Sequence, residues 1–237
     1  LTVLLFNPKR KSNGKISKLS NIKDKTLIGK NVEINDGVII KNNVQIGDNV
    51  IIDSNSYIDN NVIINNGTKI GSNCHIENSQ IGKNCIIQSG VVIGSTGFGF
   101  FEDDNSLIDF PHLGQVIIKD NVTIGSNTTI ARGSLDNTII DDNVRIDTLV
   151  LIAHNVTIGK NCIIAGQCGI AGSTVIKDKV IMGGQVGISG HLVIGSNVKI
   201  AAKSGVIKNI PNNTAVGGYP AVNIRDWHRS TINKYKK

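Results

Sequence analysis

Aliphatic residues recur every six positions along most of the chain, and this period is the strongest signal in the sequence. The series starts at Ile16, runs unbroken to Ile76 and, after slips in register, continues to Val206. A fixed internal repeat identifies an architecture before any single residue does. Six matches neither the 3.6-residue period of a helix nor a long alternating strand, so the pattern predicts short strands separated by corners. Three such hexads would close one triangular coil.

The other hexad positions favour the same architecture. With the aliphatic residue as position one, position two is often Gly, position four is very often Asn, and position five is small or apolar. Gly and Asn tolerate the left-handed backbone of a tight corner. Hexapeptide folds commonly coil left-handed, against the usual crossover rule. We therefore expect an all-β protein, a left-handed parallel β-helix over residues 16–208, with roughly nine to ten coils stacked about 4.8 Å apart.

Three segments interrupt the repeat. Residues 1–15 read as an apolar end followed by a basic linker. Residues 95–115 read as a loop that leaves the prism and carries four of the five phenylalanines. Loops of this length with their own apolar residues are usually functional or interfacial. Residues 209–237 read as a tail with a short C-terminal helix from about residue 222.

The four cysteines, Cys74, Cys85, Cys162 and Cys168, all occupy position five. This inward position predicts buried free thiols that act as small apolar residues. No disulfide framework is expected, which favours a reducing, cytoplasmic compartment. No apolar run reaches 18 residues, so we expect no membrane span.

Histidine is the side chain best suited to proton transfer at neutral pH, and the chain has five. His154 and His191 belong to hexads 36 residues apart, which is two coils, so both should lie near one edge of the prism. Gly172 lies between them, one coil from His154, and its unshielded N–H could meet a substrate oxygen. The alternative is that both histidines are exposed corner residues without a role.

Several segments, in this order along the chain, carry a more specific pattern: Gly97-Phe98-Gly99-Phe100, Pro111-His112-Leu113-Gly114, Thr128 to Thr138, Ile152-Ala153-His154-Asn155, Ser189-Gly190-His191 and Gly218-Tyr219-Pro220-Ala221. Together they resemble the UDP-3-O-acylglucosamine N-acyltransferases of lipid A biosynthesis, over nearly the whole chain. Thr96 and Ala131 stand where that family often has Asp. The family usually begins with a separate α/β domain, and the resemblance implies that residues 1–15 are its remnant and linker.

The resemblance implies transfer of a 3-hydroxyacyl chain from acyl carrier protein to the 2-amino group of UDP-3-O-(3-hydroxyacyl)glucosamine. It implies His154 as general base, Asp147 as its orienting partner and the Gly172 N–H as oxyanion donor. His191 would position substrate. Phe98 and Phe100, in the 95–115 loop, are further candidates for substrate binding. No metal or separate cofactor is expected, because the donor carries its own phosphopantetheine thioester.

The resemblance further implies a homotrimer with sites between neighbouring subunits. The net charge of +7 and a basic tail with Arg225 and Arg229 would steer the acidic carrier protein. The dispersed basic residues and the lack of a recognition motif argue against nucleic acid. Membrane contact would be at most peripheral.

Other functions share the repeat. A CoA-dependent N-acetyltransferase acting on a nucleotide-linked amino sugar has the same fold and a corner histidine. A non-enzymatic hexapeptide scaffold would be indifferent to His154. A γ-class carbonic anhydrase requires three zinc-binding histidines, two of them close in sequence, and no such pair occurs here.

Overall fold

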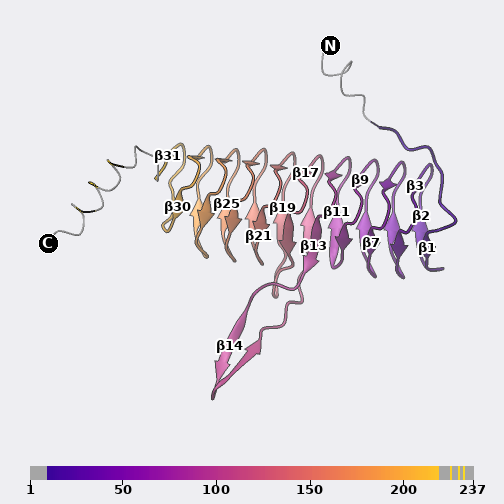
Figure 1. The fold of residues 1–237 in the computed structure, drawn as a ribbon, viewed down its shortest axis with the longest axis horizontal. Helices are drawn as coiled ribbons and strands as arrows, with labels where there is room; N and C mark the ends of the chain where they lie inside the picture. The colour runs from indigo at the N-terminus through magenta and orange to yellow at the C-terminus, as the bar shows by residue number, and fades with distance from the viewer. Residues whose placement is uncertain (1–9, 219–224, 226–228, 230–231, 233–237) are drawn as a thin grey trace, which may run out of the picture.

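The computed structural model describes residues 10–218 together with Arg225, Arg229 and Ile232. It is a left-handed parallel β-helix, as predicted, in which the chain winds through three flat sheets that enclose one core (Figure 1). We call the sheets the first, second and third face, in the order in which each coil visits them. The first corner joins the first face to the second, the second corner joins the second to the third, and the third corner returns to the first.

The first face comprises β1 (Asn21–Ile22), β4 (Ile39–Ile40), β7 (Tyr57–Ile58), β10 (His75–Ile76), β13 (Val92–Ser95), β18 (Thr129–Ala131), β21 (Leu151–Ile152), β24 (Gly169–Ile170), β27 (Gly187–Ile188) and β30 (Gly205–Val206). The second face comprises β2 (Leu27–Ile28), β5 (Gln45–Ile46), β8 (Ile63–Ile64), β11 (Ser79–Ile81), β16 (Val116–Ile118), β19 (Thr138–Ile140), β22 (Thr157–Ile158), β25 (Val175–Ile176) and β28 (Val193–Ile194). The third face comprises β3 (Glu33–Ile34), β6 (Ile51–Ile52), β9 (Lys69–Ile70), β12 (Ile86–Ile87), β17 (Thr123–Ile124), β20 (Arg145–Ile146), β23 (Ile163–Ile164), β26 (Ile181–Met182), β29 (Lys199–Ile200) and β31 (Ala215–Val216).

Residues 18 apart are ladder partners, as a three-hexad coil requires. Ile40 pairs with Ile58 on the first face, and Ile146 pairs with Ile164 on the third. Position-one and position-five side chains form a single buried core along the rod. Position four is left-handed, with φ 59° at Asn155, and the same conformation extends to residues other than Asn, such as Leu149 and His191. Because this backbone costs most residues free energy, the preference for Asn follows from the corner itself.

The ladder extends further along the chain than the expected boundary at residue 208. Ile210 forms a bridge with Ile194, and β31 pairs with β29 on the third face. The predicted C-terminal helix lies mostly outside the described residues, as does the segment Leu1 to Phe6. Arg225, Arg229 and Ile232 are helical and exposed. Among the described residues, no helix is long and apolar enough to cross a bilayer.

The 95–115 loop contains a two-stranded antiparallel hairpin, β14 (Phe100–Asp103) and β15 (Ser106–Asp109). The hairpin projects sideways from the prism (Figure 1). All eight of its strand residues are exposed. An isolated two-stranded hairpin is marginally stable in water, so we expect this hairpin to pack against a partner molecule.

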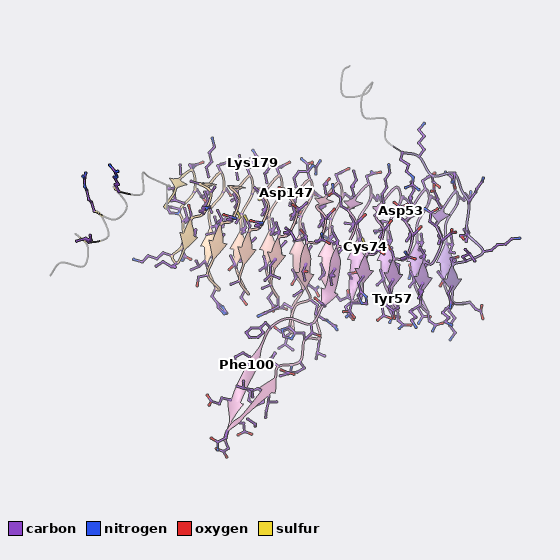
Figure 2. The ribbon with its side chains drawn as sticks, viewed as in Figure 1. Asp53, Tyr57, Cys74, Phe100, Asp147 and Lys179 are labelled. Atoms are coloured by element: carbon purple, nitrogen blue, oxygen red, sulfur yellow. The ribbon has the colours of Figure 1, made fainter. Side chains whose placement is uncertain are left out.

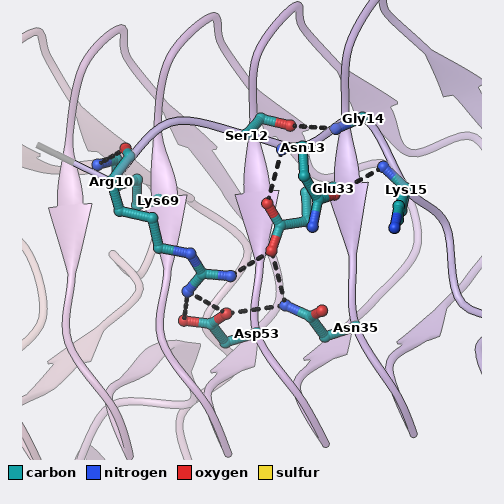
Figure 3. Close-up of polar contacts among 9 residues, drawn as sticks. All are labelled: Arg10, Ser12, Asn13, Gly14, Lys15, Glu33, Asn35, Asp53 and Lys69. Atoms are coloured by element: carbon teal, nitrogen blue, oxygen red, sulfur yellow. Dashed lines mark hydrogen bonds and ion pairs between the residues drawn. The ribbon is translucent and has the colours of Figure 1, made fainter.

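An ion-paired strap fixes the chain where it enters the prism (Figure 3). Arg10 bonds both oxygens of Asp53, at 2.8 and 3.0 Å, and also pairs with Glu33. The Asn13 N–H donates to Glu33 at 3.0 Å. Burial works to raise the pKa of Glu33, but the hydrogen bonds from Asn13 and Arg10 outweigh it and the pKa falls below its usual value. The strap therefore holds a charged carboxylate that is itself buried on the third face.

The four cysteines are buried and unpaired, as predicted. Burial raises the pKa of Cys85 and of Cys162 to about 11. Since the thiolate is the reactive form, the native protein should react with a thiol reagent far more slowly than the denatured chain. We expect titration with a chromogenic disulfide to show all four thiols only after denaturation. Rapid labelling of the native protein would contradict this packing.

Candidate active site

His154, Gly172 and Gly190 occupy position three of three successive coils at the first corner. The Ser173 N–H donates to the His154 carbonyl at 3.0 Å, and the His191 N–H donates to the Gly172 carbonyl at 3.0 Å. The stacking predicted from the 36-residue spacing is therefore confirmed. His191 lies at position four, in a left-handed conformation with φ 60°, and is exposed.

The side chain of His154 is oriented by Asn155. Its Nδ1 lies 3.0 Å from Asn155 Oδ1. The amide orientation of Asn155 is fixed, because Oδ1 accepts the Ser134 N–H at 3.0 Å while Nδ2 donates to the Asp136 carbonyl at 3.2 Å. An amide oxygen only accepts, so Nδ1 of a neutral His154 carries the proton. Nε2 is then the unprotonated nitrogen, with its lone pair available to accept a proton.

Gly172 places a backbone amide beside that nitrogen. A Cβ atom at residue 172 would lie 2.6 Å from His154 Nε2, so the imidazole can lie over this residue only because it is glycine. Along the second corner an acidic or amide side chain of the next coil accepts the position-three N–H, as Asp178 does for Lys160 at 2.9 Å. At the first corner Asn60 does so for Asn42 at 3.1 Å. The residue above Gly172 is Gly190, which has no side chain. Within the described chain the Gly172 N–H therefore has no acceptor and can serve a ligand.

Within one chain Asp147 does not contact His154, so its predicted orienting role is not met inside the subunit. Asp147 follows β20 at the third corner, whereas His154 follows β21 at the first corner. The Asp147 carboxylate accepts the Gly166 N–H at 3.0 Å. Figure 2 shows Asp147 toward the edge of the prism opposite the projecting hairpin. A separation of seven residues is one hexad plus one, so the two side chains lie at successive corners with a whole face of the prism between them.

An apolar trough runs along the first face from His154. On β24, β27 and β30 the outward position is glycine, and a Cβ built on Gly169, Gly187 or Gly205 would meet no atom within 4 Å. The trough has a volume of about 600 Å³ and is almost entirely apolar, with the His154 ring and Gly172 at one end and Ile207 at the other. The 18-residue spacing of these glycines was visible in the sequence, but sequence reasoning considered only the corner glycines and missed it.

The 95–115 loop contributes an aromatic wall. Phe98 lines the trough although 84% of its surface remains exposed. Phe100 packs edge-to-face on Phe98 with ring centroids 5.3 Å apart. The same loop brings His112 against His154, at 5.1 Å between ring centroids. Sequence reasoning placed His112 in the loop without a role, because a loop outside the repeat has no predictable register.

The remaining candidates lie apart from this cluster. His191 is at the same corner as Gly172 but does not line the trough. Arg225 and Arg229 lie beyond the last coil. Among the described residues, no group of three His, Cys, Asp or Glu side chains is arranged to hold a metal ion.

Two family models match the chain. Residues 137–172, which include both His154 and Gly172, match the bacterial transferase hexapeptide, described as six repeats. Residues 22–99 match the GMPPB C-terminal domain.

Curated relatives give a more specific similarity. A probable UDP-3-O-acylglucosamine N-acyltransferase of Arabidopsis thaliana is 42% identical over 161 residues, which is 68% of this chain and 53% of that protein. The UDP-3-O-acylglucosamine N-acyltransferase of Rickettsia akari is 47% identical over 152 residues, which is 64% of this chain and 44% of that protein. The chain is homologous to UDP-3-O-acylglucosamine N-acyltransferases. It spans about half the length of the curated relatives it matches.

Solved structures share the fold. An Arabidopsis UDP-N-acetylglucosamine acyltransferase superposes with a TM-score of 0.65 at 23% identity, covering 91% of this chain and 77% of that one. The Campylobacter jejuni UDP-N-acetylglucosamine acyltransferase gives a TM-score of 0.64 at 22% identity, covering 93% and 81%. At this identity the likeness establishes the β-helix alone.

Proposed function

We propose that this protein is an N-acyltransferase that moves a 3-hydroxyacyl chain from acyl carrier protein to the 2-amino group of UDP-3-O-(3-hydroxyacyl)glucosamine. The observation that carries the proposal is the unprotonated Nε2 of His154 beside the acceptor-free Gly172 N–H, at the end of an apolar trough. The named relatives supply the substrate class.

In the proposed reaction, the substrate amine attacks the thioester carbonyl while His154 Nε2 takes a proton from the attacking nitrogen. The negative oxygen of the tetrahedral intermediate accepts the Gly172 N–H. Collapse breaks the carbon–sulfur bond, and the departing thiolate takes the proton from His154, which restores the neutral imidazole. Asn155 Oδ1 holds Nδ1–H throughout and stabilises the imidazolium. The step uses no metal or separate cofactor, because the phosphopantetheine thioester arrives on the donor.

The trough is suited to the donor's hydrocarbon chain. Each buried methylene contributes about 0.8 kcal/mol, so a chain laid along the glycine floor supplies substantial binding energy. Phe98 and Phe100 would cover the chain where it approaches His154. His191, two coils beyond His154 along the same corner, would contact a polar part of either substrate.

Charge supports the proposed donor. Acyl carrier proteins are acidic, and this chain has a net charge of +7 with Arg225 and Arg229 exposed beyond the last coil. Opposite charges of this kind accelerate encounter. We propose no nucleic-acid partner and at most peripheral membrane contact. The buried unpaired thiols support a cytoplasmic location.

We propose a homotrimer with sites between subunits. The projecting hairpin exposes Phe101 and Leu107, and the trough is open along one side. A neighbouring copy would cover both. Sedimentation at micromolar concentration should give three times the 25.3 kDa chain mass. A monomer would refute the assembly, and shortening the hairpin to a tight turn should shift the equilibrium toward monomer.

The deciding experiment is a donor comparison. Acylation of the UDP-linked amino sugar should proceed with 3-hydroxyacyl carrier protein and be much slower with acetyl-CoA. The reverse preference would favour the CoA-dependent acetyltransferase. Absence of transfer from either donor, with a folded trimer, would favour a scaffold.

A further inference from the structure

His112 is a buried histidine whose polar atoms have no partner. It lies between β15 and β16, in the 95–115 loop, and only 6% of its surface is exposed. Neither Nδ1 nor Nε2 forms a hydrogen bond within the described part of the chain. Buried polar groups are usually satisfied, because each unmade hydrogen bond costs about 1–3 kcal/mol. An unsatisfied imidazole in a packed position calls for a functional explanation.

The ring of His112 packs on the ring of His154. The centroids are 5.1 Å apart and the planes cross at 67°, and the Phe110 ring lies edge-to-face with His112 at 6.2 Å between centroids. Gly97 fills the narrow space beside both histidines. A Cβ there would lie 2.6 Å from His112 Nε2 and 2.8 Å from His154 Cβ. The two imidazoles and Gly97 therefore form one close-packed unit.

The same short segment anchors both histidines. Arg132 donates from Nε to the Gly114 carbonyl at 2.6 Å and from a terminal nitrogen to the Leu113 carbonyl at 2.9 Å. Ser134 accepts the Leu113 N–H and donates to Asn155 Oδ1. Arg132 and Ser134, two residues apart, thus bond both the backbone beside His112 and the side-chain amide that orients His154.

The surroundings of His112 favour its neutral form. Burial lowers the pKa of His112, and the charges of His154 and Arg132 lower it further, which together outweigh the upward effect of the Phe110 backbone. Among the described groups, these two are the charged or titratable side chains that act on it, and neither is acidic. A neutral ring can stay in contact with His154 when His154 takes up a proton, whereas a charged ring would repel it.

We propose that His112 is a positioning residue for the acyl transfer: its neutral buried ring packs against His154 and holds Nε2 over Gly172. This inference rests on the proposed function. Protonation of His112 in acid would force the two rings apart and misdirect the base.

The first test compares two substitutions in the complete protein. His112→Ala should lower kcat about 10–100-fold and leave KM within about threefold, because misplacement of a reacting group acts on the chemical step. His112→Phe restores a flat ring of similar shape and should keep at least about a third of the parent kcat. The acid side of the kcat profile should be steeper in the parent, where protonation of His112 adds to the loss, than in His112→Phe, which lacks that group.

Two outcomes would overturn the proposal. Unchanged kcat in His112→Ala would remove the positioning role. Equal damage in His112→Phe and His112→Ala, with a raised KM, would mean that the nitrogens of His112 bind substrate instead.

A matched glycine pair provides a second test. Gly97→Ala should lower kcat as His112→Ala does, because the added methyl separates the rings. Gly99→Ala should have a smaller effect, since its Cβ would lie 3.3 Å from the His112 ring. Neither residue has a positive φ, so the comparison measures space and not backbone strain. Equal kcat in the parent and Gly97→Ala would count against the packed unit.

Nitrogen NMR of the imidazoles tests the inference without any activity. His154 should keep its proton on Nδ1 in the parent and in His112→Phe, and should exchange between tautomers in His112→Ala. If the parent shows no acyl transfer but these spectra appear, the proposed function fails and the positioning contact stands. Identical His154 spectra in all three proteins would overturn the contact itself.

Discussion

Replacing His154 by alanine is expected to lower kcat about 10²–10⁴-fold, the usual contribution of a general base. The residue lies at a corner of the prism and contributes no core side chain, so the melting temperature should change little. His191→Ala should cost less, because its ring lies outside the trough. Steady-state kinetics with the carrier-protein donor checks this. Parent-like activity in His154→Ala would refute the assigned base.

Asn155 allows a matched control for the orientation of that base. Asn155→Ala removes the acceptor for Nδ1–H but also places alanine in a left-handed corner with φ 59°. Asn161 has the same φ at the second corner, away from the histidines. Both alanine variants should lose stability because both force alanine into the same conformation, and Asn155→Ala should lose more because it also removes the bonds to Ser134 and Asp136. Only Asn155→Ala should also lose kcat.

Gly187→Leu is expected to abolish most turnover of long-chain donors. The new side chain would enter the open trough, where a Cβ meets nothing, so the fold should tolerate it. Displacing about four methylenes at about 0.8 kcal/mol each removes about 3 kcal/mol, which is about 10²-fold in kcat/KM. Donors with short chains should be spared. Gln45→Leu, at the same strand position on the second face, is the control.

A uniform loss of activity with donors of every length would show that Gly187→Leu had damaged the catalytic corner. Unchanged kcat/KM for long donors would place the acyl chain elsewhere. The comparison therefore separates the role of the trough from the role of His154.

The hexad period was enough to predict the faces, the inward residues and the left-handed corners, because each of these depends only on local phase. Phase also placed His154 and Gly172 correctly at one corner. Asp147 was chosen as the orienting partner by resemblance, and its own phase assigns it to a different corner from His154 within the chain. Asn155 was overlooked because it resembled every other corner Asn. Only its bonds to Ser134 and Asp136 distinguish it.

The contact between His112 and His154 could not be predicted in the same way. Residues 95–115 leave the repeat, so no count of six relates them to the corner. Their position depends on tertiary bonds such as those of Arg132 to Leu113 and Gly114. A periodic sequence thus predicts its repeating coils well, whereas the positions of its insertions depend on tertiary contacts that the period does not specify.

The 18-residue ladder also makes the length of this protein adjustable in discrete units. Each coil pairs only with its two neighbours, as Ile58 does with Ile40 and Ile76. Inserting one whole coil after residue 70, beyond the strap partners Asp53 and Lys69, would keep every pairing on both sides and lengthen the rod by about 4.8 Å. The catalytic corner and the glycine floor, from β21 to β30, would be left intact. The distance between the entry strap and the catalytic corner can therefore be changed in steps of one coil without altering the residues of either site.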